Sequence, residues 1–385
     1  MLCNRFAERV EFALGLLLLA GSASAQSLDL KFTQLPPNLP VNALAVQADG
    51  KLLVGGNFSK IDGVAHPCLV RLNSDGTLDA AFDPQTLAGC SVNALLVEAS
   101  GNILVGGSFT KMGGGSRRNI ARLHADGTPD TAFNAYADQP VWAFAVPGDG
   151  KLLVGGDFSA VGGAARDRLA RLDAVTGLAD SAFSPSVSGS VRAVLPQADG
   201  HIVFGGQFGI VADVTRFRLA RVDGNGNVDA NFHPDPDSGV TALSSLPGGK
   251  LLVGGGFSQI GGASHTGLAL LDDASGAVDA SYTPYLNGVD ALLPMANGDV
   301  LVGGSFTGVN GQANHGYLAR LHADGTLDSA FHDFSRVGMT DCCVNAIALD
   351  GGFLVVGGSF LKYGSFRRDF LVRLNLDGIF ADDFQ

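Results

Sequence analysis

Seven residues that could bind a ligand recur along the chain at intervals of 49 to 55 positions. They are the second residues of seven predicted β-strands: Asn42, Asn93, Trp142, Arg192, Thr241, Asp290 and Asn345. Together they offer amides, a hydroxyl, a guanidinium, a carboxylate and the only indole of the protein. Aromatic stacking with a few placed hydrogen bonds suits a sugar or a small polar ligand. The alternative is that these side chains bond only water and one another.

A second set of candidates is basic. Eleven of the 25 lysines and arginines fall in loops of about ten residues: Lys60, Lys111, Arg117, Arg118, Arg166, Arg168, Arg216, Arg218, Lys362, Arg367 and Arg368. The whole chain has a net charge of −12, which argues against nucleic acid as a partner. A basic rim on an acidic body predicts an anionic partner, such as an acidic glycan or a cell-surface polymer. The alternative is solvated loops that pair with nearby aspartates.

Metal binding and catalysis find little support. The segment DGNGNVD places Asp223, Asn225, Asn227 and Asp229 at alternate positions, as in calcium-binding loops. Turn geometry explains the same residues, so no cofactor is predicted and calcium stays a weak candidate. The chain has no HExxH, GxSxG or Walker-type motif, and no catalytic residue is predicted. An enzyme alternative, a polysaccharide lyase or hydrolase, would depend on Asp290 and Arg192.

A repeat of about 50 residues must position these side chains. Glycine pairs recur at steps of 49 to 54 residues, each followed two positions later by phenylalanine: Gly55-Gly56, Gly106-Gly107, Gly155-Gly156, Gly205-Gly206, Gly254-Gly255, Gly303-Gly304 and Gly357-Gly358. An all-strand repeat of this length predicts a β-propeller. We therefore predict one domain over residues 26–385, a seven-bladed propeller of four-stranded antiparallel blades. Its units are 41–84, 92–134, 141–185, 191–234, 240–284, 289–331 and 344–384.

The sequence of each repeat unit predicts four strands. In the first unit they lie at 41–46, 51–58, 68–72 and 78–82. Asp-Gly turns join strands one and two and strands three and four as tight hairpins, whereas the other two links are long. The long links should share one face, where the second residue of each strand one lies at the mouth of the central channel. The glycine pair should make room for a phenylalanine of the adjoining blade. A recurring arginine, such as Arg71, should pair with a strand-four aspartate, such as Asp79.

Two segments compete to close the ring. Both 27–32 (SLDLKF) and 380–384 (FADDF) look like a fourth strand, and the sequence does not decide between them. Cys68 and Cys90 are the predicted disulfide, while Cys342 and Cys343 are predicted to form a vicinal bridge or to stay reduced.

Residues 1–25 have the pattern of a signal peptide: Arg5 and Arg9, an apolar run over 12–20, and small residues at Ala23 and Ala25. This pattern predicts export to the periplasm or the extracellular space. Nine apolar residues are too few for a membrane span, which takes roughly 20, so no transmembrane segment is predicted.

The motifs VGGxF, LARL and ADGTLDxxF resemble the bacterial delta-sixty repeat, a family of extracytoplasmic β-propellers, over almost the whole chain after the leader. The glycine pair is also similar to that of the kelch repeat. Neither resemblance implies an activity. The sequence therefore favours an exported, monomeric binding scaffold for a carbohydrate or cell-surface partner, with another protein as the alternative partner. The alternatives are the enzyme named above and a purely structural adhesion spacer.

Overall fold

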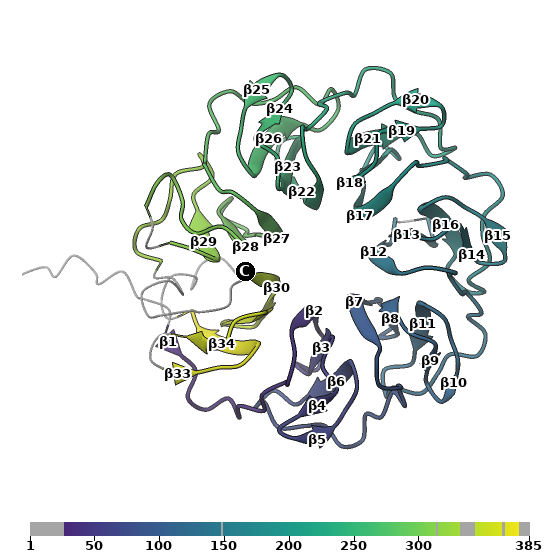
Figure 1. Cartoon of the computed structure of the whole chain (residues 1–385), viewed down its shortest axis with the longest axis vertical. Helices are drawn as coiled ribbons and strands as arrows, with labels where there is room; N and C mark the ends of the chain where they lie inside the picture. The colour runs from purple at the N-terminus through teal and green to yellow at the C-terminus, as the bar shows by residue number, and fades with distance from the viewer. Residues whose placement is uncertain (1–26, 148, 313–314, 332–342, 364–365, 377–385) are drawn as a thin grey trace, which may run out of the picture.

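The computed structural model describes residues 27–147, 149–312, 315–331, 343–363 and 366–376. The predicted signal peptide and the 380–384 segment lie outside these residues. The described residues form strands and turns without a helix, and seven sheets surround a central channel (Figure 1). The predicted seven-bladed all-β propeller is therefore confirmed. No helix of the length and apolar character that a membrane crossing requires occurs in the described part of the chain.

The innermost strand of every blade carries one of the seven candidate ligand residues. These first strands surround the channel (Figure 1): β2 (Val41–Val46), β7 (Ser91–Val97), β12 (Val141–Ala145), β17 (Ser190–Pro196), β22 (Val240–Leu246), β27 (Val289–Pro294) and β30 (Val344–Asp350). Each pairs antiparallel with the strand that follows it in the chain.

The second strand is the middle of each sheet and is buried on both faces by the neighbouring blades, which explains its continuous apolar sequence. The second strands are β3 (Leu52–Gly56), β8 (Ile103–Ser108), β13 (Lys151–Gly156), β18 (Ile202–Gln207), β23 (Lys250–Gly255), β28 (Val300–Gly304) and β31 (Phe353–Gly358). The third strands are β6 (Leu69–Leu72), β11 (Ile120–Leu123), β16 (Leu169–Asp173), β21 (Leu219–Val222), β26 (Leu268–Asp272), β29 (Leu318–Leu321) and β34 (Leu371–Asn375).

The predicted four-stranded blade is wrong in its outer strand. In six blades the expected fourth strand is reduced to one bridge, such as that between Leu72 and Leu78. The chain then turns, because the Asp79 carboxylate accepts a hydrogen bond from the amide of Ala81 (3.1 Å) and the Asp79 carbonyl accepts one from Phe82 (3.1 Å). A side chain that bonds its own backbone in this way competes with a longer strand ladder.

The long link between strands two and three forms a small hairpin in six blades. These hairpins lie at the outer circumference of the ring (Figure 1): β4 (Lys60–Ile61) with β5 (Val64–Ala65), β9 (Lys111–Met112) with β10 (Gly115–Ser116), β14 (Ala160–Val161) with β15 (Ala164–Ala165), β19 (Ile210–Val211) with β20 (Val214–Thr215), β24 (Gln259–Ile260) with β25 (Ala263–Ser264), and β32 (Lys362–Tyr363) with β33 (Phe366–Arg367). Several of them bridge to the link between blades, as Pro37 does to Ile61. Both long links therefore share one face, as expected.

The N-terminal segment closes the ring. Strand β1 (Ser27–Leu28) pairs antiparallel with β34 of the seventh blade, so that residues from the two ends of the chain share one sheet. Just after β1, the carboxylate of Asp29 accepts hydrogen bonds from the Arg373 guanidinium at 2.7 and 2.9 Å. Asp29 thus takes the place that Asp79 has in blade one. The segment 27–32 supplies the fourth-strand position that the sequence alone left open.

The predicted arginine–aspartate pairs are present, and the same arginines also tie neighbouring blades together. Arg71 binds Asp79 at 2.8 Å within its blade and donates to the Ala125 carbonyl of the next blade. Four other arginines repeat this inter-blade bond: Arg122, Arg171, Arg221 and Arg373. Blade five has Leu270 at this position and lacks the guanidinium.

Candidate ligand site at the channel mouth

Each of the seven candidate ligand residues occupies a β-bulge. In blade one Val41 lies opposite Gly56 and Ala43 lies opposite Gly55, so Asn42 between them has no partner across the ladder. The same register shift occurs in the six other blades. A bulge re-aims the side chain of its extra residue, which is why bulges are common next to functional sites. The repeat therefore points one variable side chain per blade toward the channel.

All seven of these residues line one cavity of about 490 Å³ at the mouth of the channel, which we call the mouth cavity. Its wall also includes Asn57, Ser91, Ser108 and Pro140. The seven side chains are half-buried, neither enclosed in the core nor fully in solvent. Farther along the channel, the lining consists mainly of alanine, leucine and other apolar side chains of the first strands. The cavity is therefore a polar cup over an apolar channel.

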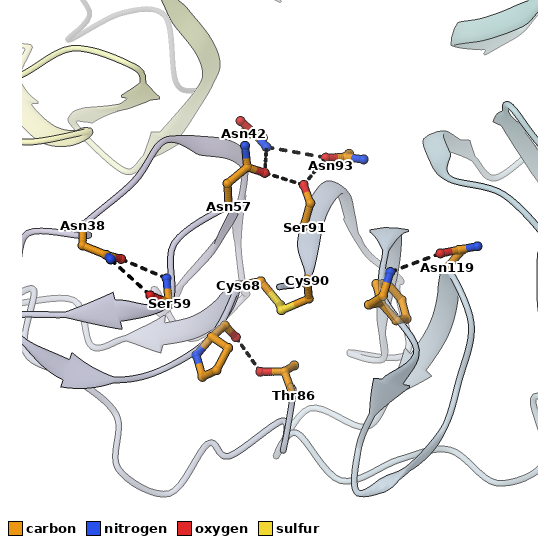
Figure 2. Close-up of a disulfide and its surroundings, with 12 residues drawn as sticks. Asn38, Asn42, Asn57, Ser59, Cys68, Thr86, Cys90, Ser91, Asn93 and Asn119 are labelled. Atoms are coloured by element: carbon orange, nitrogen blue, oxygen red, sulfur yellow. Dashed lines mark hydrogen bonds between the residues drawn. A yellow bond between two sulfur atoms is a disulfide. The ribbon is translucent and has the colours of Figure 1, made fainter. Parts of the chain in front are cut away.

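One side of the mouth cavity is a chain of amides and hydroxyls. Asn345 donates to the carboxamide oxygen of Asn42 (3.3 Å), and Asn42 donates to Asn57 (3.0 Å) and more weakly to Asn93 (3.5 Å). The hydroxyl of Ser91 contacts the oxygens of Asn57 and Asn93 at 2.5 and 2.6 Å (Figure 2). Much of the hydrogen-bonding capacity on this side is thus already used between neighbours, as the alternative interpretation of these residues expected.

The opposite side holds an aromatic–cation pair. The Arg192 guanidinium lies 3.8 Å above the centroid of the Trp142 ring. The indole Nε1 of Trp142 donates to the carboxylate of Asp157 at 2.8 Å, which fixes the ring. Burial lowers the pKa of Arg192, and the nearby Asp157 carboxylate opposes that shift. Stacking places the guanidinium against a rigid ring without neutralising it directly, which leaves its N–H groups for a ligand.

Sequence reasoning missed two supports of the site. Asn57 and Asp157 occupy the same position of the repeat, directly after the glycine pair, and each bonds a candidate ligand residue of its own blade. The signal was available at the end of strand two, where the glycine pair is followed by Asn57 in blade one and by Asp157 in blade three. The sequence alone did not reveal the role of Asn57 and Asp157, because only the bulge brings their position beside the second residue of strand one.

Asp290 is the least satisfied residue of the mouth cavity. Its neighbour Thr241 donates to the Val289 carbonyl, but the Asp290 carboxylate has no hydrogen bond or ion pair to any described residue. Burial raises the pKa of Asp290, with no opposing interaction. A half-buried carboxylate that faces a cavity without a partner is a natural acceptor for a ligand hydroxyl or amine.

This environment predicts a pH-dependent effect of Asp290→Asn. Because the folded-state pKa lies above the ordinary value of 3.8, folding is weakened as pH rises through that window and the carboxylate ionises. The asparagine variant should therefore melt at a higher temperature than the wild type at about pH 7 and at a similar temperature at about pH 2.5, well below 3.8, where the aspartate is protonated in both states. Asp49→Asn, in an exposed turn, is the control. An equal shift at both pH values would contradict the prediction.

The predicted rim arginines lie on or next to the outer hairpins, and most of them bond the protein itself. Arg166 and Arg216 donate to backbone carbonyls of their own blades, Arg168 binds Asp167 at 3.2 Å, and Arg367 binds Asp369 at 2.8 Å. Arg218 donates to the Pro236 carbonyl, and Arg117 and Arg368 to carbonyls next to themselves in the chain. Arg118 differs, since its exposed side chain lines a cavity.

The weak calcium candidate is built as a turn. The carboxylate of Asp223 accepts hydrogen bonds from the amide of Asn225 (2.8 Å) and from Asn227, while that of Asp229 contacts Arg221 at 3.2 Å. Among the described residues, no group of three or more histidine, cysteine, aspartate or glutamate side chains is arranged to hold a metal ion. The carboxylates of this segment thus already serve protein groups.

Cys68 and Cys90 form a disulfide, as the sequence predicts, with Cα atoms 5.9 Å apart (Figure 2). The bridge joins the start of strand three in blade one to the residue just before strand one of blade two. Cys342 lies outside the described residues, so the two alternatives for Cys342 and Cys343 stay open.

Solved structures share this fold at low sequence identity. The WD40 propeller domain of Doa1 matches with a TM-score of 0.59 and 14% identity, covering 91% of this chain and 96% of that one. The RRP9 WD40 repeats match with a TM-score of 0.56 and 12% identity, covering 89% and 98%. The extracellular domain of the putative one-component system BT4673 from B. thetaiotaomicron matches at 0.55 and 15%, covering 89% of this chain and 40% of that one. These similarities show the fold alone.

The repeat itself matches one family model. No curated protein sequence matches the chain. The model, described as a domain of unknown function (DUF5122) beta-propeller, matches seven times, at residues 47–82, 98–133, 148–183, 197–232, 246–282, 296–331 and 352–378. Each match begins near the end of a first strand and, except for the last, runs to the aromatic residue that ends the expected fourth strand. Seven successive matches cover more than half of the chain, and the chain therefore belongs to the DUF5122 β-propeller family.

Proposed function

We propose that the protein is an exported binding scaffold that holds a carbohydrate at the mouth of its channel. The observation that supports this most directly is the convergence of seven variable side chains, one per blade, on a single cavity of about 490 Å³. That volume suits a short oligosaccharide rather than a single ion. The lining combines an aromatic ring with a guanidinium, a carboxylate and amides, which is the mixture that sugar recognition uses.

The three sides of the cavity have different roles in this proposal. Trp142, held by Asp157 and stacked with the Arg192 guanidinium, offers a rigid aromatic wall to a sugar. Asp290 accepts from a hydroxyl, and the amide side supplies donors that already lie in fixed orientations. Because these groups are held by bulges and neighbours, little conformational entropy is lost on binding.

Export is the second part of the proposal. It is supported by the signal-peptide pattern of residues 1–25 and by the Cys68–Cys90 disulfide, since structural disulfides persist in oxidising compartments. The resemblance of the repeat motifs to the extracytoplasmic delta-sixty repeat agrees with it. We further propose that the scaffold acts as a monomer.

Catalysis is a weaker candidate. Glycosidases of the usual kind use two carboxyl groups on either side of the scissile bond. The lining of the mouth cavity contains one, Asp290. The nearby Asp157 does not line the cavity, and its carboxylate accepts the hydrogen bond from Trp142. The raised pKa of Asp290 would suit a general acid, but without a second carboxylate binding is the better supported role.

Titration of the intrinsic fluorescence tests the proposal, because Trp142 is the only tryptophan of the chain. We expect a saturable change with at least one member of a panel of short neutral oligosaccharides. In calorimetry, Trp142→Ala should weaken binding at least about tenfold, which corresponds to roughly 1.4 kcal/mol. Tyr136→Ala removes an exposed aromatic residue that does not line the cavity, and it should leave the affinity unchanged. Binding that survives Trp142→Ala would place the ligand elsewhere, and no binding by any oligosaccharide would reject the carbohydrate proposal.

A further inference from the structure

A second cavity lies in blade two on the same face as the mouth cavity. Its volume is about 310 Å³, and we call it the blade-two cavity. One wall is the link between blades one and two, residues 87–90, and the other is the link between blades two and three, residues 138–140. Its floor is formed by residues 108–111, which run from strand β8 into strand β9.

Two cations line the blade-two cavity without an acidic partner. Lys111 and Arg118 make no ion pair and no side-chain hydrogen bond with any described residue. The one carboxylate in the lining, that of Asp138, accepts hydrogen bonds from the amides of Ser159 (2.9 Å) and Ala160 (3.0 Å) and from the Ser159 hydroxyl (2.6 Å). Its donors therefore come from blade three. Although burial raises the pKa of Asp138, these bonds lower it overall. The cavity thus keeps an excess of positive charge.

Blade two is distinctive in carrying both cations. Lysine recurs at the position of Lys111 in blade one (Lys60) and blade seven (Lys362). Seven residues later, however, blade one has Pro67 and blade seven has Asp369, where blade two has Arg118. A residue that varies among repeats of one scaffold is not required for the fold. The pairing of Lys111 with Arg118 is therefore better explained by a ligand than by packing.

The blade-two cavity adjoins the mouth cavity. Ser108 and Pro140 belong to the lining of both. The Cys68–Cys90 disulfide anchors the wall formed by residues 87–90, since Cys90 belongs to that wall and is covalently bonded to Cys68 of blade one. The two cavities thus lie side by side, close enough for one chain molecule to occupy both.

We propose that the blade-two cavity is an anion subsite, and that the ligand is an acidic oligosaccharide running outward from the mouth. In this arrangement Trp142 and Asp290 contact one sugar, and Lys111 and Arg118 bind a carboxylate or sulfate carried by a sugar farther along the chain. The inference depends on the proposed function, because it extends the ligand of the mouth cavity. Charge-assisted hydrogen bonds from a guanidinium and an ammonium group give such a subsite both strength and selectivity.

The test compares matched ligands and matched variants. Calorimetry would use a panel of neutral oligosaccharides, each paired with its counterpart oxidised to a carboxylate at C6. For the wild type we expect the acidic member of a binding pair to bind at least about tenfold more tightly, and the advantage to shrink as salt rises. The double variant Lys111→Ala/Arg118→Ala should bind both members equally. Lys60→Ala, at the same repeat position in blade one, should keep the full advantage.

The outcomes separate the two proposals. If acidic and neutral members bind the wild type equally, or if the double variant keeps the acidic advantage, the anion subsite is rejected while the mouth site stands. If neutral members do not bind but acidic ones do, with an affinity that the double variant loses and Trp142→Ala leaves unchanged, Lys111 and Arg118 form an anion site of their own, and both the mouth proposal and the extended ligand are rejected. Inorganic sulfate is the last comparison: if it binds as tightly as the acidic oligosaccharides, the cavity takes free anions and the chain ligand is rejected.

Discussion

Gly206→Ala is expected to destabilise the protein by about 3 kcal/mol or more, although it adds a single methyl group. A Cβ at Gly206 would lie 1.9 Å from the carbonyl oxygen of Ser190 and 3.0 Å from the Cα of Val191. Both are backbone atoms, so no side-chain rotation relieves the overlap. Either β17 or β18 must move, and each is buried between two blades. Thermal or denaturant unfolding measures the loss.

The same variant should also disturb the mouth cavity. The crowded backbone belongs to the bulge that holds Arg192, the residue stacked on Trp142. A shift of β17 should therefore alter the tryptophan fluorescence of the folded protein at low temperature. Gly115→Ala is the matched control, because a Cβ there meets no atom within 4 Å. If Gly206→Ala were as stable as Gly115→Ala, packing would not be the reason for the glycine pair.

Asp29→Ala should have the second largest effect, a loss of about 3 kcal/mol in the free energy of unfolding. Asp29 and Arg373 are 6% exposed each, and their hydrogen bonds of 2.7 and 2.9 Å join the N-terminal segment to the last described strand. Removing the carboxylate leaves a buried guanidinium with Asp350 as its remaining acidic partner, at 3.2 Å. Because Asp350 still neutralises part of the charge, we expect a loss at the lower end of the usual cost of breaking a buried ion pair.

Two comparisons make the closure prediction specific. Asp49→Ala, in an exposed turn, should change stability little. Asp29→Ala/Arg373→Leu should recover part of the loss, because it removes the unpaired charge and copies blade five, where Leu270 holds this position. A double variant that is less stable than Asp29→Ala would show that Arg373 stabilises the ring mainly through its other contacts, such as the Phe32 ring 4.3 Å away.

The seven-fold repeat, the strand class and the candidate ligand positions could be predicted from the sequence, because each depends on local pattern. An apolar run of five or six residues between Asp-Gly turns specifies a buried strand whatever surrounds it. The prediction that Asn42 and its six counterparts share the channel mouth followed from this pattern and from the need for a long link between blades. For the same reason the cross-strand pairing of Arg71 with Asp79, residues eight apart in one hairpin, could be anticipated.

Contacts between blades could not be predicted, because they depend on how neighbouring sheets are rotated and not on any one repeat. The glycine pair is the clearest case. A phenylalanine of the adjoining blade was expected there, and this was wrong: a Cβ at Gly155 would meet Val191 of the next blade at 2.7 Å, while one at Gly156 would meet Phe158 of its own repeat at 2.7 Å. Sheet twist brings a first-strand valine of the next blade against the first glycine, and the phenylalanine that lies against the second glycine comes from the same blade.

The closure of the ring and the blade-two cavity were decided in the same way by tertiary structure. Two segments had the fourth-strand pattern, and only the pairing of Ser27 with Asn375 distinguishes them. Lys111 and Arg118 look like ordinary loop cations in the sequence, yet the structure places them together in one cavity, between the links on both sides of blade two. The sequence alone determined how many blades there are and which positions vary. The packing of blade against blade and the closure of the last sheet decided which of those positions meet, because both bring together residues far apart in the chain.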